Sequence, residues 1–560
     1  MKRLLLPLLS LMLLNTTSFG SGAGASGKDA PDAIFVNGDI YTQAAPQRVQ
    51  AMAVRDGRII AIGSSDDIRK LKQGRTEVVD LGGHFVMPGF NDAHLHLAAG
   101  GLVHLEVDLV GVKSLAEMQQ RIAEHAKTTP PGDWIIGRGW DHTLWVGETL
   151  PTRQDIDAVT GDHPAIFVRV DGHIGVANTA ALKVAGVFTN SPNPPGGKID
   201  RDASGTATGI LRETAKDMML AKVPRPSLEQ RRRGIQLALA EAARAGLTSL
   251  QDNSEWEDFL VYEELEKQGK LTARISEWLM FNQPLPLLQE HRAQHPADDP
   301  MLHTAMLKGF MDGSLGSRTA ALLAPYTDDP GNTGLPQYDQ STLNHMAVER
   351  SAAGFQLGFH AIGDRAAQMA LDAFAEAERD AHQNHRERDF RFRIEHDQVI
   401  DPGQIEQYRK LGVIASIQPN HLLTDMNWAV ERIGTVRAKT SYPWKDFLDQ
   451  GVRIAFGTDY PVEPLAPFRG VYAAVTRKNE AGTKEYFPEQ KLTIQQALAA
   501  YTTGSAYAQF AEHEKGTLAL GRLADFVVLD RDLTAIPASE ILKTQVLRTV
   551  VGGKTVYQAQ

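Results

Sequence analysis

The sequence predicts an α/β fold: a (β/α)8 TIM barrel, with a small β-sandwich built from both ends of the chain and a cap inserted after the first barrel strand. Two observations carry this prediction. Eight apolar segments end in polar residues, and most are separated by stretches long enough for a helix and its loops. Near both ends of the 560-residue chain, short Val- and Ile-rich segments are punctuated by Asn-Gly, Asp-Gly and Gly-Gly turns, as in small β-sheets.

The first 25 residues have the pattern of a secretory signal peptide. Two basic residues precede an apolar run over 4–14, and small and polar residues follow. The run is too short to span a bilayer. We expect cleavage after Ala25 or, failing that, after Gly20, and a periplasmic or extracellular location for the mature chain.

The expected sandwich takes residues 30–85 and 515–560, and the barrel takes residues 86–514. Within the barrel, the stretch 98–245 is too long for a plain loop and contains elements of its own, so it is interpreted as a cap over the barrel mouth. The eight strand candidates lie at 86–96, 246–252, 272–281, 304–312, 355–364, 390–398, 412–419 and 452–459.

Composition excludes several classes of protein. The chain has no cysteine, so disulfides, thiolate metal ligands and a cysteine nucleophile are excluded together. The net charge of −10 becomes −12 when Lys2 and Arg3 leave with the signal peptide, and no basic tract is present, so a nucleic-acid partner is not expected. Beyond the signal, no stretch of transmembrane length lacks charges. A small molecule is the expected partner, and a homodimer is left open.

Histidines and one aspartate close several of the strand candidates. His94 and His96 are two residues apart at the end of the first strand, so both imidazoles point to the same side and can converge on a metal. An HxH pair alone is a weak signal in a chain with 18 histidines. His360, His396 and Asp459 each end another strand candidate, where a barrel presents its catalytic groups. Together the five supply ligands for one metal or two.

Lys308 stands on an apolar strand candidate, where it alternates with Met306 and Phe310 and faces the same side. A bare ammonium group beside several metal ligands would be repelled and poorly solvated. Carboxylation by CO₂ would convert Lys308 into an anionic carbamate that is able to bridge two cations.

A series of motifs covers nearly the whole mature chain: "PGFNDAHLHL", "GWDHTLW", "DGHIGVANTAAL", "LKGFMDGSLGSRTAAL", "HAIGDRA", "RIEHDQ", "SIQPNH", "GTDYPV" and "KGTLALGRLADFVVLD". Through these motifs the chain resembles the amidohydrolase superfamily, in particular the amidohydrolase 3 branch that includes N-substituted formamide deformylase-like proteins. The resemblance implies that His94, His96 and Asp459 bind the more buried metal, that His360 and His396 bind the other, and that carboxylated Lys308 bridges them. Zinc is the expected metal, with Mn, Fe and Ni left open.

This family implies hydrolysis of a non-peptide C–N bond of amide type by a metal-bound hydroxide. Asp459 is the candidate catalytic residue, as the general base that later protonates the leaving nitrogen. The candidates for substrate binding lie in motif segments of the cap and of the loop after the fourth strand, with packing or salt bridging as the equal alternative: Trp140, Asp141, His173 and Arg318.

Three alternative functions stay open at this stage. An esterase or lactonase uses the same attack of water on an acyl carbon. A mononuclear deaminase shares the barrel but needs no bridging lysine, so Lys308 argues against it. A non-catalytic regulatory or binding protein of the same family has no reason to keep a full set of buried polar ligands. The sequence leaves the substrate undetermined, because one barrel hosts many chemistries.

Overall fold

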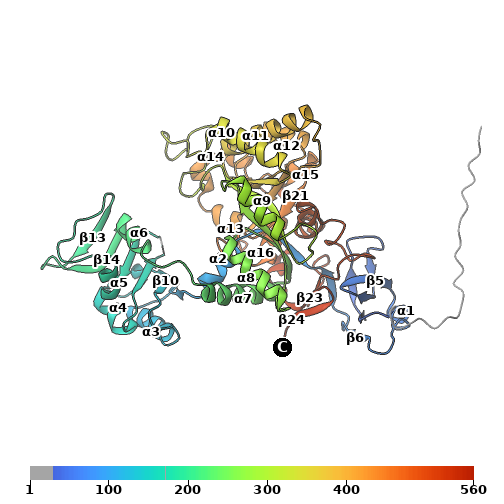
Figure 1. Cartoon of the computed structure of the whole chain (residues 1–560), viewed down its shortest axis with the longest axis horizontal. Coiled ribbons are helices and arrows are strands. Elements are labelled where there is room, and N and C mark those ends of the chain that lie inside the picture. The colour runs from blue at the N-terminus through green and yellow to red at the C-terminus, as the bar shows by residue number, and fades with distance from the viewer. Residues whose placement is uncertain (1–29, 171) are drawn as a thin grey trace, which may run out of the picture.

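The computed structural model describes residues 30–170 and 172–560, and the expected signal peptide lies outside them. Figure 1 shows three parts next to one another: a β-sandwich, a central barrel and a cap that stands off the barrel. Among the described residues, we find no helix whose length and apolar character would suffice to cross a membrane.

The central part is an eight-stranded parallel sheet, which confirms the predicted barrel. Its order is β21-β20-β19-β18-β17-β16-β15-β8, so the strands follow one another around the barrel as they do along the chain. Between the first and last strands, the backbone N–H of Asp459 donates to the carbonyl of His94 at 2.7 Å and ties the two edges together. The strands are β8 (Phe90–Leu95), β15 (Leu247–Asp252), β16 (Arg274–Met280), β17 (Leu302–Phe310), β18 (Gln356–Ala361), β19 (Arg393–His396), β20 (Ile414–Ile417) and β21 (Ile454–Phe456).

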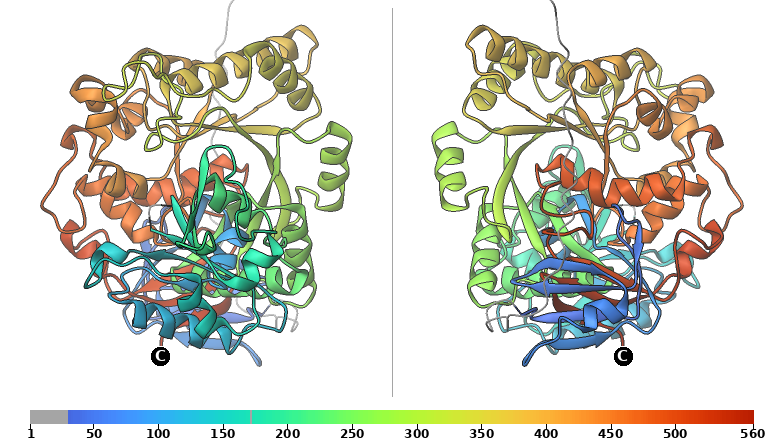
Figure 2. Two further views of the ribbon diagram at one scale, coloured as in Figure 1. Left: turned by 90° about the vertical axis from the view of Figure 1, so that its left-hand side faces the viewer. Right: turned by 90° about the vertical axis from the view of Figure 1, so that its right-hand side faces the viewer.

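Helices surround this sheet and shield its apolar side (Figure 2). The longest, α11 (Asp364–Gln383), buries a continuous face of alanines with Leu371 and Phe374, as its apolar spacing predicts. The others are α8 (Trp256–Lys267), α9 (Leu285–Gln294), α10 (Gln340–Ala352), η2 (Pro402–Gln404), α12 (Ile405–Lys410), α13 (Asn420–Asp425), α14 (Ala429–Lys439), α15 (Trp444–Asp449), α16 (Pro467–Thr476), η3 (Pro488–Gln490), α17 (Ile494–Ala499), the π-helical η4 (Ala500–Gly504), α18 (Ser505–Ala508) and η5 (Ala538–Lys543).

The sandwich joins both ends of the described chain. One sheet has the order β24-β23-β22-β7-β2-β3 and the other β5-β4-β1-β6. Phe35 and Phe526 meet edge to face between the sheets, with ring centroids 4.9 Å apart. The strands are β1 (Ala33–Val36), β2 (Asp39–Tyr41), β3 (Arg48–Val49), β4 (Ala51–Arg55), β5 (Arg58–Gly63), β6 (Glu77–Asp80), β7 (Phe85–Pro88), β22 (Phe526–Leu529), β23 (Val546–Val551) and β24 (Lys554–Gln558), and α1 (Ser65–Arg69) packs beside them.

One boundary differs from the prediction. The first barrel strand was expected to begin at Val86, but β7 runs through Pro88 and pairs with β22 of the sandwich. Gly89 and Phe90 then lead into the barrel. The cause is that apolar residues run without a break across the junction, so their pattern alone does not separate the two sheets.

The cap is a separate body on a two-helix neck. Its six-stranded sheet has the order β13-β14-β12-β11-β10-β9. The neck is formed by α2 (Leu97–Val103), which leaves the barrel after His96, and α7 (Leu228–Arg244), which returns to it. Cap elements are β9 (Val107–Asp108), α3 (Leu115–Ala126), β10 (Ile135–Trp140), η1 (His142–Leu144), α4 (Arg153–Thr160), β11 (Ala165–Arg169), β12 (Ile174–Ala177), α5 (Thr179–Val184), β13 (Gly197–Arg201), β14 (Ala207–Glu213) and α6 (Thr214–Leu220).

Candidate metal centre

The predicted ligands come together at the carboxyl ends of the barrel strands. All six line one cavity of about 330 Å³: His94, His96, Lys308, His360, His396 and Asp459. They come from β8, β17, β18, β19 and the segment after β21, because parallel strands in a barrel end on the same face.

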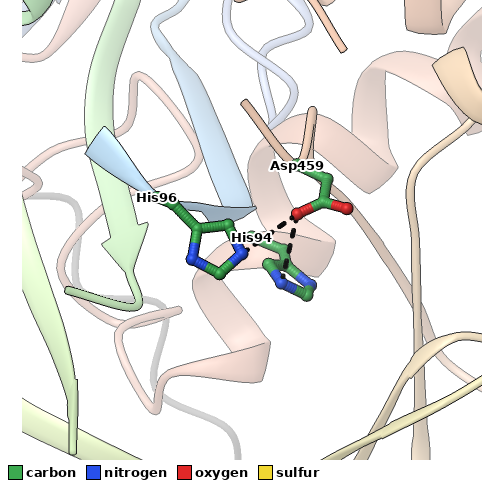
Figure 3. Close-up of side chains that lie close together, drawn as sticks. All are labelled: His94, His96 and Asp459. Atoms are coloured by element: carbon green, nitrogen blue, oxygen red, sulfur yellow. Dashed lines mark ion pairs between the residues drawn. The ribbon is translucent and has the colours of Figure 1, made fainter. Parts of the chain in front are cut away.

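The first group of potential ligands consists of Asp459 and the two histidines that face it. One carboxylate oxygen, Oδ1, lies 3.2 Å from Nε2 of His96 and 3.6 Å from Nε2 of His94 (Figure 3). Both imidazoles therefore turn the same ring nitrogen toward one carboxylate oxygen. These three side chains form one of the two groups within residues 30–170 and 172–560 that have the spacing of metal ligands.

The second group uses the other oxygen of the same carboxylate and includes a residue that was not predicted. Oδ2 of Asp459 lies 3.1 Å from Nε2 of His421 and 4.0 Å from Nδ1 of His396. His421 is on α13, immediately after β20. The motif "SIQPNH" contained it, but it lies four residues beyond the end of the strand, where the rule that ligands close a strand no longer applies.

His360 lies beside this second group. Its ring centroid is 4.2 Å from that of His396, and its Nε2 is 3.1 Å from the carbonyl oxygen of Gly313. Burial foremost, and then the charge of Lys308, lower the pKa of His360 to about 3. The imidazole is therefore neutral, which is the form that binds a metal.

Two of the candidate ligands, His396 and Asp459, adopt strained backbone conformations. His396 has φ 84° and Asp459 has φ 58°, in the region that residues other than glycine rarely adopt. At His396, this geometry departs from the regular strand and turns the side chain toward the cavity. Such strain of about 1–3 kcal/mol per residue persists where the surrounding structure enforces it, and it concentrates at functional sites.

A buried ion pair orients His94 from behind. Nδ1 of His94 lies 2.9 Å from Oε2 of Glu395, and the Nε of Arg393 donates to Oε1 of the same glutamate at 2.9 Å. Burial raises the pKa of Glu395, but Arg393 and His94 outweigh it and hold the value at about 2, so this carboxylate stays ionised. A carboxylate behind an imidazole fixes its tautomer and makes it a better ligand.

Lys308 reaches the centre from β17. It is 1% exposed, its Nζ is 3.0 Å from Nε2 of His94, and burial lowers its pKa to about 8. The rings of Trp278 and Phe310 lie 5.5 and 5.1 Å from the nitrogen. This is the apolar setting that was predicted for Lys308.

A divalent cation fits these residues. Several buried polar atoms at the centre lack a hydrogen-bond partner in the described chain: Nδ1 and Nε2 of His396, Nε2 of His421 and Oδ1 of Asp459. Unpaired polar atoms are costly to bury, and each of these three side chains can offer a lone pair to a cation. Coordination would satisfy one ring nitrogen of each histidine and the carboxylate oxygen.

The four predicted substrate-binding residues lie outside this cavity. Trp140 is fully buried in the cap, where its indole N–H donates to the carbonyl of Phe167 at 2.9 Å. Asp141 pairs with Arg169 at 2.6 Å, and His173 lies 3.0 Å from Glu213 within the cap. Arg318 pairs with Asp328 at 2.8 Å on a barrel loop, two residues after the cavity-lining Gly316. In this arrangement they pack and form ion pairs, and their role toward substrate stays a prediction.

Histidines, an aspartate and a buried lysine lie together at the strand ends of this barrel, which is the arrangement found in metal-dependent hydrolases. The chain belongs to the amidohydrolase family, whose model matches residues 77–557. It is thus a hydrolase that acts on carbon–nitrogen bonds other than peptide bonds and depends on a divalent metal.

Two relatives and one solved structure illustrate the likeness. Protein LONG AFTER FAR-RED 3 of Arabidopsis thaliana is 34% identical over 94% of this chain and 91% of its own length. N-substituted formamide deformylase of Arthrobacter pascens is 27% identical, over 94% of this chain and 98% of its own. The crystal structure of an uncharacterized metal-dependent hydrolase from Pyrococcus horikoshii superposes with a TM-score of 0.75 at 31% identity, covering 90% of this chain and 99% of that one.

Glu395→Gln is expected to weaken metal binding by about 10- to 100-fold, because the amide cannot anchor the Nδ1–H of His94 as a carboxylate does. The measurement is a zinc titration by calorimetry. Glu277→Gln is the matched control, since this fully buried glutamate contacts His295, away from the centre. Equal zinc affinity in both variants would contradict the orienting role of Glu395.

Proposed function

We propose that the centre holds two zinc ions bridged by a carboxylated Lys308, and that the protein hydrolyses the amide bond of a small, uncharged molecule. The observation that carries this proposal is the shared carboxylate: the two oxygens of Asp459 face two different histidine groups. The first group would be His94, His96 and Asp459, and the second would be His360 and His396 with His421 beside them. Manganese, iron or nickel would suit the same nitrogen and oxygen ligands.

Carboxylation of Lys308 needs only CO₂ as a co-reactant. The neutral amine adds to CO₂, a C–N bond forms, and one proton is released. The product carries a negative charge where the free lysine would carry a positive one. Nζ of Lys308 already lies 3.0 Å from the ligand nitrogen of His94, so an added carboxylate would extend among the other ligands.

The bound metal supplies Lewis acidity, which makes water a better nucleophile and polarises the carbonyl of the substrate. Asp459 takes the proton of the attacking water and returns it to the leaving nitrogen. Burial raises the pKa of Asp459, but His94 and the other facing imidazoles lower it well below the ordinary value, so the carboxylate starts ionised and can accept a proton. The products are a carboxylic acid and an amine.

The cavity wall favours an uncharged substrate. Its apolar side chains come from the end of β17 and from the segments that follow the barrel strands: Phe310, Leu315, Ile362, Trp428 and Val462. Among the described residues that line the cavity there is no arginine to pair with a substrate carboxylate, and Lys308 is committed to the centre. An apolar acyl or N-substituent would pack against this wall, whereas a carboxylate would lose its hydration without a partner.

A hydrolysis screen with zinc-loaded protein tests this function. N-substituted formamides and other uncharged amides are expected to react with a higher kcat/KM than N-acyl amino acids, small peptides or lactones. Faster turnover of lactones or esters would establish the esterase alternative instead. No turnover of any class by a fully metal-loaded protein would favour the regulatory alternative.

We further propose export to a periplasmic or extracellular space, because residues 1–25 have the pattern of a signal peptide. N-terminal sequencing of the protein from its native host is expected to find a start between about residues 20 and 30. An intact Met1 in a cytosolic fraction would overturn this proposal. The solution mass of the same sample would show whether the mature chain is a homodimer.

A further inference from the structure

The cap has its own core and meets the barrel through its neck. The two apolar clusters of the cap include buried residues from Val107 to Met219, and neither contains a described residue of the barrel. Figures 1 and 2 show the cap standing in front of the barrel face from which α2 and α13 emerge. The neck helices pack into the barrel core through Leu97 of α2 and through Ile235 and Leu239 of α7, so a change in the position of the cap that moves these helices also acts on the barrel.

The neck helices touch backbone to backbone. A Cβ at Gly101 of α2 would lie 2.4 Å from the carbonyl oxygen of Gly234 on α7, and one at Gly234 would lie 2.9 Å from the carbonyl carbon of Gly101. No side chain larger than hydrogen fits at either position. The two neck helices therefore meet at these two glycines. The contact lies close to the end of β8, which His96 follows.

Tyr460 is wedged into this neck. Its ring occupies the space above Gly100, where an added Cβ would lie 1.8 Å from the ring carbon Cε1. The hydroxyl oxygen is 2.9 Å from Nε2 of His104, at the end of α2, and it donates to Oε2 of Glu241 on α7 at 3.2 Å. His104 and Glu241 also contact each other at 2.7 Å. One phenol thus joins both neck helices.

The backbone of Tyr460 is hydrogen-bonded to a candidate ligand of the metal centre. The carbonyl of Tyr460 accepts a hydrogen bond from the backbone N–H of His96 at 2.7 Å. Tyr460 also follows Asp459 directly, and the N–H of Asp459 donates to the carbonyl of His94 at 2.7 Å. A displacement of the ring by the neck therefore acts on the residue that carries the shared carboxylate.

We infer that Tyr460 is a positioning residue that couples the cap to the metal centre: metal occupancy and cap position influence each other through the cluster of Tyr460, His104 and Glu241. This inference rests on the proposed metal centre but goes beyond it. Linkage requires the effect to be reciprocal, so a metal that prefers one arrangement of Asp459 must also shift the cap.

The absence of cysteine in the sequence allows a direct test with two introduced labels. Val146→Cys on the cap and Val436→Cys on α14 of the barrel are both highly exposed positions for spin labels. We expect pulsed electron–electron double resonance to show a shift in the distance between the two spin labels when zinc is added. Tyr460→Phe keeps the ring in place but removes the hydroxyl, and it is expected to lose most of that shift.

Two further variants sharpen the test. Tyr472→Phe removes another hydroxyl, that of a buried tyrosine on α16, which donates to the carbonyl of Asn479 at 2.9 Å. This variant should keep the full shift. Glu241→Ala leaves Tyr460 intact but removes the acceptor of its hydroxyl, and it should reduce the shift as Tyr460→Phe does. An unchanged distance in the parent protein on zinc addition, or a full shift in Tyr460→Phe, would overturn the coupling.

Calorimetry on the same labelled sample separates this inference from the function on which it rests. If zinc binds but the cap does not move, the proposed metal centre is supported and only the coupling is overturned. Zinc that does not bind at all overturns both.

Discussion

Asp459→Asn is expected to lower kcat by at least ~10²-fold while the protein remains folded, since general acid–base catalysis contributes about that much. The amide has nearly the same shape as the carboxylate, but it cannot accept the proton of water, and it offers one oxygen where two are needed for the two histidine groups. Steady-state kinetics at saturating zinc, together with circular dichroism, is the measurement. Asp449→Asn, at an exposed residue of α15, is the control and should keep full activity.

The metal content of the same sample decides how the loss is interpreted. Low activity at full metal content assigns the loss to proton transfer, and low activity with little metal assigns it to coordination. Turnover close to that of the parent protein in a metal-replete Asp459→Asn sample would remove Asp459 from the mechanism.

Lys308→Ala is expected to lower metal content and activity together, because it removes the proposed bridge between the two ligand groups. Lys308→Arg should fare no better, since its charge is fixed and it cannot form a carbamate. Metal analysis by mass spectrometry, beside an activity assay, is the measurement. Lys515→Met is the matched control: Lys515 is also buried, and it donates to Ser249 away from the centre.

A variant at Lys308 that keeps its full metal content would contradict the bridging role. In that case the buried lysine would act only through its packing against Trp278 and its contact with His94. Equal loss of metal in Lys308→Ala and Lys515→Met would also count against a specific role.

The barrel could be predicted because its sequence pattern is local. Each strand is an apolar run that closes on a polar residue, and parallel strands bring those ends to one face. His94, His96, His360 and His396 each lie at or just after a strand end, as expected. The ends of the chain likewise carried turn signals, such as Gly552 and Gly553, which join β23 and β24 with positive φ.

Residues that act through geometry outside the regular strand could not be predicted in the same way. Simple alternation puts Glu395 and His396 on opposite faces of β19, but the positive φ at His396 lets both contact the centre. His421 was missed because it lies on a helix after the strand.

The cap shows a different limit. "GWDHTLW" contains polar and aromatic residues that suit a binding site, yet Trp140 fills the core of the cap. An aromatic residue in a motif can serve packing as well as recognition, and sequence spacing does not distinguish the two. The position of the cap over the mouth depends on contacts across the neck, between residues more than 100 positions apart in sequence, such as Gly101 and Gly234.

The central claim is that these ligands hold two zinc ions bridged by carboxylated Lys308. The most direct test is a crystal structure of zinc-loaded protein, with anomalous difference maps recorded on both sides of the zinc absorption edge. The account predicts two peaks roughly 3.5–4 Å apart, one beside each oxygen of Asp459, and extra density beyond Nζ of Lys308 in contact with both. A single peak with a bare Lys308, or no peak among these ligands, would contradict it.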